Sequence, residues 1–163
     1  MLNQYVATPC GVDIGTTWTD AFQIPEVPLG NYVLNGMLFL DGAANGDAMV
    51  KLLVRHGRGR PQELFGTVHF AGYGPGAAGF SAAWPNAAPE SASYGQNETE
   101  IGPVTVGTFG VGTRSPLRLD GKIQVVDNES APYHLVVAIR QVTSQSGGLC
   151  VAEDSYLELR PLD

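Results

Sequence analysis

The stretch YVLNGMLFL, residues 32–40, decides the fold class of this chain. Successive side chains of a strand point to opposite faces, and both alternating sets in this stretch are mostly apolar, so it predicts a strand covered on both faces. The runs around it show the same two-residue repeat and are separated by Gly, Pro and Asn, with no convincing long helix. We therefore expect an all-β protein with this stretch at the centre of its core.

Further strands are expected where apolar and polar residues alternate. Residues 48–55 fit a strand, although Asp47 could instead cap a short helix there. Gly121, in the middle of another such run, predicts a bulge or a tight turn. The remaining runs cover residues 63–70, 101–109, 117–125, 133–139 and 151–162, with a short strand around 80–84 as an addition. About eight strands of this length predict a single antiparallel β-sandwich, jelly-roll-like, over residues 1–163.

Two segments depart from the strand pattern. Residues 1–30 contain several Gly and Pro and are expected to form a loose, extended N-terminal segment. Residues 71–97 are dominated by Gly, Ala, Pro, Ser and Asn, which predicts a long loop. The aromatic residues of this loop could form an exposed binding surface, or they could fold over the core of the protein itself.

The composition narrows the class of function. Of the 163 residues, 44% are hydrophobic and only 15% are charged, whereas an ordinary soluble domain has about 25% charged residues. The net charge of −7 argues against nucleic-acid binding, because phosphates must be met by clustered Lys and Arg. One local basic group stands out, namely Lys51, Arg55, His56, Arg58 and Arg60. It fits a solvated or inter-subunit salt-bridge patch, or a site for an anion or a partner.

The N-terminus lacks the basic start and apolar core of a signal peptide, so we expect a protein that is made and folds in a cytosol and is not secreted by that route. No apolar stretch reaches the length of a membrane helix. Cys10 and Cys150 lie 140 positions apart, which is neither a zinc nor a redox spacing. Two free thiols are expected in a reducing compartment, and a disulfide is the alternative if the chain ends lie side by side.

No constellation of residues predicts catalysis, and we expect a protein that is not an enzyme and takes no cofactor or metal. Glu98 and Glu100 could share one face of a strand and meet a cation or a sugar, or they could be solvated acids at a strand edge. His56, His69 and His134 have no His or Cys neighbour at metal-ligand spacing, which indicates surface histidines.

Three short motifs carry a family resemblance, namely IGTTWT at 14–19, LGNYV at 29–33 and YLELRP at 156–161. In these motifs and in their order the chain resembles small bacteriophage virion proteins of the jelly-roll or β-sandwich type, found as capsid decoration proteins and as head-fibre or tail-fibre domains. The resemblance implies a virion location, no enzymatic activity and an oligomer, with a trimer favoured because capsid lattices offer three-fold positions. The implied partner is the major capsid protein or another virion protein.

The expected interface residues are aromatic side chains and the basic group. They are Trp18, Tyr73, Phe80, Trp84, Tyr94, Arg55, Arg58 and Arg60. The rival hypothesis is a carbohydrate-binding or receptor-binding fibre module, in which the aromatics of the 71–97 loop would stack on sugar rings. A small glycan hydrolase is a third hypothesis.

Overall fold

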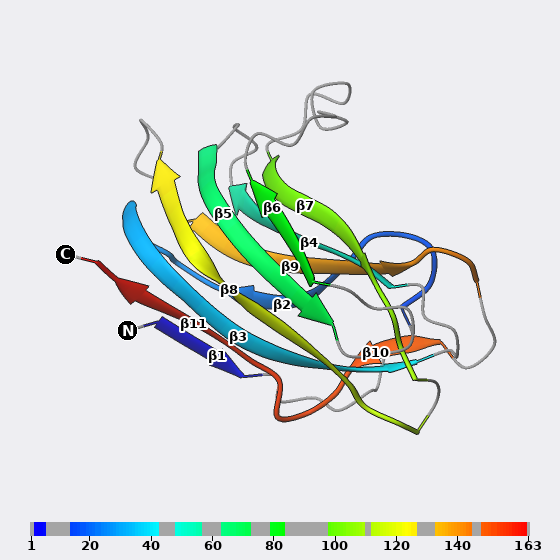
Figure 1. Cartoon of the computed structure of the whole chain (residues 1–163). Coiled ribbons are helices and arrows are strands. Elements are labelled where there is room, and N and C mark those ends of the chain that lie inside the picture. Colours follow the sequence, from blue (N-terminus) through cyan, green and yellow to red (C-terminus); the bar gives the residue numbers. More distant parts are fainter. Residues whose placement is uncertain are drawn as a thin grey trace.

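A computed structural model describes residues 2–5, 14–42, 48–56, 63–72, 79–83, 98–109, 112–126, 133–144 and 148–162. In this part of the chain two antiparallel sheets pack face to face, as Figure 1 shows, which confirms the predicted all-β sandwich. The strands are β1 (Leu2–Tyr5), β2 (Thr19–Ile24), β3 (Gly30–Gly42), β4 (Ala48–His56), β5 (Glu63–Gly72), β6 (Gly79–Ala83), β7 (Glu98–Val106), β8 (Ser115–Val126), β9 (Tyr133–Gln141), β10 (Leu149–Val151) and β11 (Tyr156–Pro161). Residues 48–56 thus form a strand and not the alternative helix.

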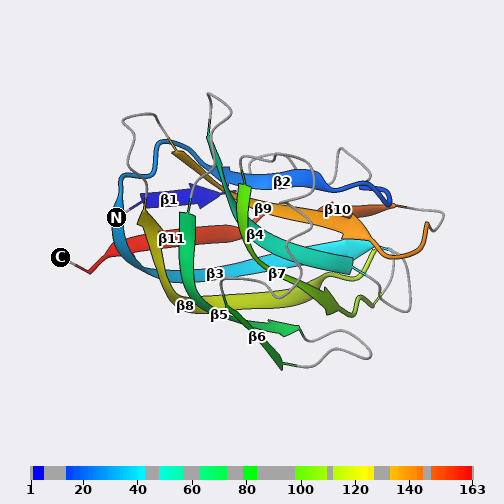
Figure 2. The same ribbon diagram turned by 90° about the horizontal axis from the view of Figure 1, so that it is seen from above.

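Most consecutive strands of the chain lie in different sheets. The larger, seven-stranded sheet has the order β1-β11-β3-β8-β5-β6 with β10 also paired to β3, and the smaller has the order β2-β9-β4-β7. Strands that follow one another in the chain change sheets, except for the β5–β6 hairpin and the β10–β11 pair. The hairpin extends the larger sheet, and both of its strands contact β7 of the smaller sheet, so that it closes one side of the sandwich (Figure 2).

Strand β3 occupies the middle of the larger sheet and supplies much of the core. On its inner face Tyr32, Leu34, Leu38 and Leu40 are all at most 3% exposed. On its outer face Val33, Asn35, Met37 and Phe39 are half-buried. The predicted central position is confirmed, while the predicted burial on both faces is complete only on the inner one.

The prediction of a loose N-terminal segment is wrong for two of its described parts, because Leu2–Tyr5 form β1 of the larger sheet and Thr19–Ile24 form β2 of the smaller sheet. Residues 14 and 15 also bridge the sheets at one end. The Ile14 N–H donates to the Leu149 carbonyl at 2.6 Å, and the Gln141 N–H donates to the Gly15 carbonyl at 2.7 Å. The buried Gln141 amide donates a further hydrogen bond to the Ile14 carbonyl at 2.8 Å, so β10 and β9 are joined through this short segment.

Gly121 does not mark a bulge or a turn, contrary to the prediction. It lies within continuous β8 and pairs in regular register with Leu34 on one side and Val68 on the other. A Cβ atom at this position would collide with the Thr67 carbonyl oxygen and would come within 2.9 Å of the Val68 Cα atom. The glycine is therefore needed for the close approach of the β5 and β8 backbones.

The final run, expected as one strand over residues 151–162, is divided into β10 and β11 by a turn. Fully buried Ser155 stabilises this turn, since its hydroxyl donates to the Ala152 carbonyl at 2.7 Å and accepts the Phe39 N–H at 2.9 Å. Asp154 has a φ of 70°, the left-handed backbone region that few residues other than Gly adopt. The turn thus fixes the end of β10 and the start of β11 against β3.

Replacing Gly121 with Ala is expected to lower the free energy of unfolding by about 1–3 kcal/mol or more, because the new methyl group meets backbone atoms that cannot move alone. Urea unfolding followed by circular dichroism measures the change. Gly15→Ala is the matched control, since no atom lies within 4 Å of the added Cβ, and it should change the value by less than about 0.5 kcal/mol. Equal effects of the two substitutions would contradict this account of the β5–β8 contact.

Alkaline pH should weaken the fold through Tyr32. Its hydroxyl donates to the Pro28 carbonyl at 2.6 Å, and burial raises the pKa of Tyr32 above its ordinary value of 10.0. The neutral form is favoured in the folded state, so this contribution to stability is complete below about pH 10 and is lost as pH rises further. Urea unfolding at pH 7 and pH 11 should show a smaller pH-dependent loss for Tyr32→Phe than for the unaltered protein. An identical loss would exclude Tyr32 as its source.

Candidate functional site

The outer face of the smaller sheet is covered by Trp18. This half-buried residue, just before β2, packs on a second apolar cluster formed by Leu53, Val136 and Ala138, all 0% exposed. Those three residues lie on β4 and β9, on the side of the sheet that faces away from the main core. The fold therefore uses Trp18 to protect an apolar strip outside the sandwich.

Two cations lie against the Trp18 ring. Lys51 Nζ is 4.5 Å from the ring centroid, and the Arg140 guanidinium carbon is 5.3 Å from it, both within the range of cation–π attraction. Lys51 also forms an ion pair with Glu100 on β7, with Nζ 2.8 Å from Oε2 and only 12% and 11% of the two side chains exposed. The sequence left two alternatives for Glu100, a solvated acid at a strand edge or a carboxylate open to a cation or a sugar. The ion pair with Lys51 agrees with neither of them.

The remaining interface residues that the sequence predicts are only partly described. Arg55 pairs in register with His134 and Glu98, and Phe80 pairs with Phe70. Tyr73, Trp84, Tyr94, Arg58 and Arg60 lie outside the described residues. Their role as interface residues stays a prediction, as does a contact of Trp18 with a partner.

A hollow of about 510 Å³ lies on the outer face of the larger sheet, where β8, β3 and β11 run side by side. Its volume falls in the range of about 300–1,000 Å³ that is usual for small-molecule sites. The residues that line it are Val33, Leu34, Asn35, Asp120, Gly121, Lys122, Glu158 and Arg160. None of these residues was predicted as a site from the sequence.

The strand register arranges the side chains of this hollow in two rows. In one row Asn35 lies between Asp120 and Glu158, and in the next row Val33 lies between Lys122 and Arg160. The strand spacing places the two outer residues of each row about 10 Å apart, and the rows lie about 7 Å from each other. Two carboxylates and two cations therefore surround an amide and an apolar side chain. We name this feature the outer-face hollow.

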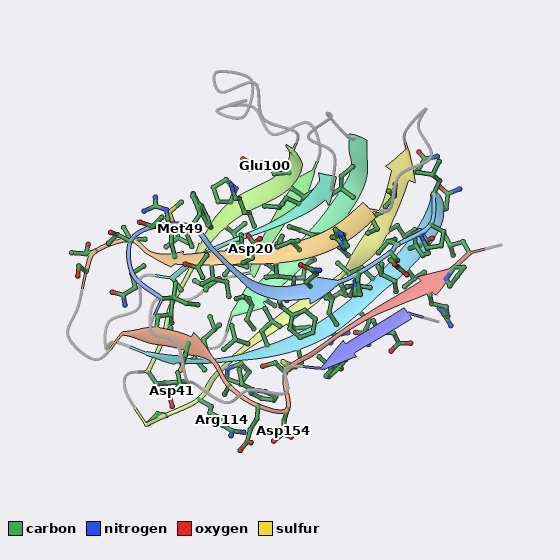
Figure 3. The ribbon with its side chains drawn as sticks, turned by 180° about the vertical axis from the view of Figure 1, so that it is seen from behind. Asp20, Asp41, Met49, Glu100, Arg114 and Asp154 are labelled. Carbon is green, nitrogen blue, oxygen red and sulfur yellow. The ribbon has the colours of Figure 1, made fainter. Side chains whose placement is uncertain are left out.

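Polar contacts at one end of the sandwich fasten the 112–114 segment (Figure 3). Asp41 Oδ1 accepts the Gly112 N–H at 2.9 Å. Arg114 lies 3.4 Å from both Glu153 and Asp154, on the turn between β10 and β11. In Figure 3 the labelled Arg114 and Asp154 lie beside each other at this end, near Asp41. These exposed contacts hold the turn and the segment together and leave the outer-face hollow open.

Cys150 is disulfide-bonded, so the expectation of two free thiols is wrong for this residue. The chain has only one other cysteine, Cys10, which lies outside the described residues. The sequence separation gave no sign of this bond, because 140 positions of chain say nothing about which strands meet. Pairing of β1 with β11 brings segments from the two ends of the chain together, as the disulfide alternative required.

The histidines do not form a metal site in the part of the chain that the structure describes. His69 is exposed on β5, as predicted, and His134 lies on β9 with Nδ1 3.4 Å from Gln23 Nε2. Among the described residues no three His, Cys, Asp or Glu side chains lie together as metal ligands would. In the same residues, no helix has the length and apolar character required to cross a membrane.

Comparison of the chain with protein-family models, with curated proteins and with solved structures finds no match. Its function is therefore inferred from the surfaces described above.

Loss of the carboxylate in Glu100→Gln should lower the free energy of unfolding by about 1–3 kcal/mol, because Lys51 would keep a nearly buried charge without its partner. Glu153→Gln is the matched control. It removes the same charge from an ion pair whose side chains are 42% and 55% exposed, and it should cost less than about 1 kcal/mol. Urea unfolding of both variants distinguishes the two effects, and an equal cost would show that burial of the Lys51–Glu100 pair has no energetic consequence.

Proposed function

We propose that this chain is a non-enzymatic structural protein of a bacteriophage particle, and specifically a capsid decoration protein that binds the outer surface of the head as an oligomer. The supporting observation is the position of its exposed apolar side chains. Among the described residues, the exposed large hydrophobic side chains are Leu29, Phe109, Val142 and Leu162, with 41–48% of each exposed. They lie in two pairs at opposite ends of the sandwich.

The first pair is formed by Leu29 and Leu162. Leu29 comes directly before β3, and Leu162 follows β11, where its N–H donates to the Asn31 carbonyl at 3.0 Å. The second pair is formed by Phe109 and Val142, which follow β7 and β9. The two strands finish at the same end of the smaller sheet, on either side of β4, because Ala48 pairs with both Val106 and Gln141.

The distance between the two pairs follows from β3. Its first residue, Gly30, adjoins Leu29, while Leu40 pairs with Ser115, whose hydroxyl accepts the Phe109 N–H at 2.7 Å. The exposed apolar side chains thus lie at opposite ends of one long strand. This distribution favours contacts made by the ends of the sandwich rather than by its sheet faces.

The size of these patches favours binding to a repeating lattice. Full burial of one such side chain contributes only about 1.5–3 kcal/mol, and about half of each side chain is already covered. One copy would therefore bind weakly after the cost of association. An oligomer that meets several equivalent sites adds these small contributions, as a decoration layer requires, and we favour a trimer because capsids offer three-fold positions.

The low charge of the chain fits this role, since 15% charged residues leave much of a surface able to lie against neighbouring subunits. The rival role, carbohydrate binding by the aromatics of residues 71–97, depends on Tyr73, Trp84 and Tyr94, which lie outside the described residues. We favour a shell-binding role over that rival because exposed apolar side chains lie at both ends of the sandwich.

The experiment adds the purified protein to phage heads assembled without it and examines them by electron microscopy. We expect regularly spaced density at a fixed ratio of copies to capsid subunits. The variants Phe109→Asp and Leu29→Asp should each reduce occupancy by tenfold or more, because a carboxylate would have to lose water at the contact.

Gln23→Glu is the control, since it adds the same charge at an exposed position on the outer face of the smaller sheet, where Gln23 pairs with Val136, and it should bind normally. Light scattering of the free protein reports its oligomeric state. A stable monomer without affinity for heads would overturn the proposal, and normal occupancy by both end variants would exclude the sandwich ends as the contact.

A further inference from the structure

The polar groups around the outer-face hollow are available for a ligand. Only one oxygen of the Asp120 carboxylate is in an ion pair, since Oδ2 lies 3.3 Å from Arg118 Nε. Within the part of the chain that the structure describes, the side chains of Lys122, Glu158 and Arg160 form no ion pair or hydrogen bond. The hollow therefore presents free donors and free acceptors on the two sides of β3.

The charges of these groups indicate what kind of ligand would fit. Two carboxylates and two cations line the same hollow, so their fields oppose one another. A phosphate or other anion would gain from Lys122 and Arg160 but would lie within about 10 Å of both carboxylates. A metal cation would be attracted by the two carboxylates but repelled by Lys122 and Arg160. The arrangement thus favours a ligand without net charge.

The hydrogen-bonding capacity of the groups is complementary. Carboxylates only accept hydrogen bonds, whereas Lys and Arg only donate them, and the Asn35 amide between them does both. A hydroxyl group also donates and accepts. Adjacent hydroxyls on one ring could therefore donate to Glu158 or Asp120 and accept from Arg160 or Lys122 across the two rows.

The floor of the hollow combines an apolar side chain with backbone. Val33 contributes the apolar surface, and Gly121, which pairs with Leu34 and shares its core-facing side of the sheet, contributes backbone. Leu34 is 0% exposed and points into the core, so its contribution to the floor is backbone. A ring with C–H groups on its face and hydroxyls around its edge matches such a floor and such walls.

We propose that the outer-face hollow binds a neutral, hydroxyl-rich sugar ring, as found in a glycan. This site lies on a sheet face. One of its rows, Val33 and Arg160, is close in register to Leu29 and Leu162, but none of the exposed apolar residues lines it, and it does not depend on the proposed shell contact. It also differs from the aromatic loop that the rival carbohydrate-binding hypothesis would use.

Saturation-transfer NMR of the full chain with maltose, cellobiose and lactose as probes tests the proposal. We expect transfer to ring protons of at least one disaccharide, with a Kd on the order of 1 mM because an open hollow covers only part of the ligand. Titration of a labelled protein should shift the amide signals of Asn35 and Glu158 first.

Two variants test the residues. Asn35→Ala and Glu158→Gln should each weaken binding about tenfold, which corresponds to about 1.4 kcal/mol. Glu153→Gln, an equivalent change of an exposed carboxylate outside the hollow, should leave the affinity unchanged. Arg160→Gln provides a second test of the other row, and circular dichroism with urea unfolding checks that all variants are folded.

Several results would overturn the proposal. These are no transfer to any of the three disaccharides, affinity that is unchanged in folded Asn35→Ala and Glu158→Gln, or binding that is lost only in Trp84→Ala. A preference for sialyllactose over lactose would show that the ligand is charged and would also overturn it. Because the head-binding experiment uses Phe109 and Leu29 variants, failure of either proposal can be distinguished from failure of the other.

Discussion

Strand β3 is hydrogen-bonded along both of its edges, and this double pairing constrains most of the molecule. It pairs with β8 over residues 30–40, with β11 over residues 32–37 and with β10 over residues 40–42. Because its register with these strands is fixed, its inner residues face the smaller sheet and its outer residues are set between β8 and β11. The core and the outer-face hollow are therefore two sides of the same strand.

The two outer sheet faces and the two ends of the sandwich carry different kinds of side chains. The smaller sheet is covered from within the chain, where Trp18 lies between two cations and an apolar strip. The larger sheet carries a polar hollow with charges of both signs. The two ends carry exposed apolar side chains. Under the two proposals, the ends would contact a protein lattice and one sheet face would bind a small polar ligand.

The close approach of β5 and β8 connects the fold with the hollow. Gly66 has a φ of 139°, and a Cβ there would collide with the Lys122 carbonyl oxygen, just as one at Gly121 would collide with that of Thr67. Both glycines thus allow the two backbones to meet directly. Because Gly121 and Lys122 also line the hollow, the contact that holds β8 against β5 also fixes the backbone on this side of the candidate site.

Local sequence patterns predicted the strands between residues 32 and 141 well, because alternation of apolar and polar residues is a property of each strand alone. They missed β1 and β2, where Pro and Gly nearby concealed short strands that are stabilised by pairing with β11 and β9. The prediction for Gly121 was also wrong, since a single Gly within a strand pattern is compatible with either a bulge or a close backbone contact. Asp120 and Lys122 lie in the alternating run predicted over residues 117–125. Nothing local showed that they would lie beside Asn35 and Val33 of β3.

The sequence by itself determined that this protein is a β-sandwich with a low charge and that its strands have one apolar face. Only the tertiary structure decided that Asn35, Asp120 and Glu158 share a row, that Trp18 covers β4 and β9, and that Cys150 is bonded. The physical reason is that the face of a side chain follows from the geometry of its own strand. Register and strand order, in contrast, depend on free energies of pairing between segments far apart in the chain, such as β1 and β11, in which Leu2 pairs with Leu159.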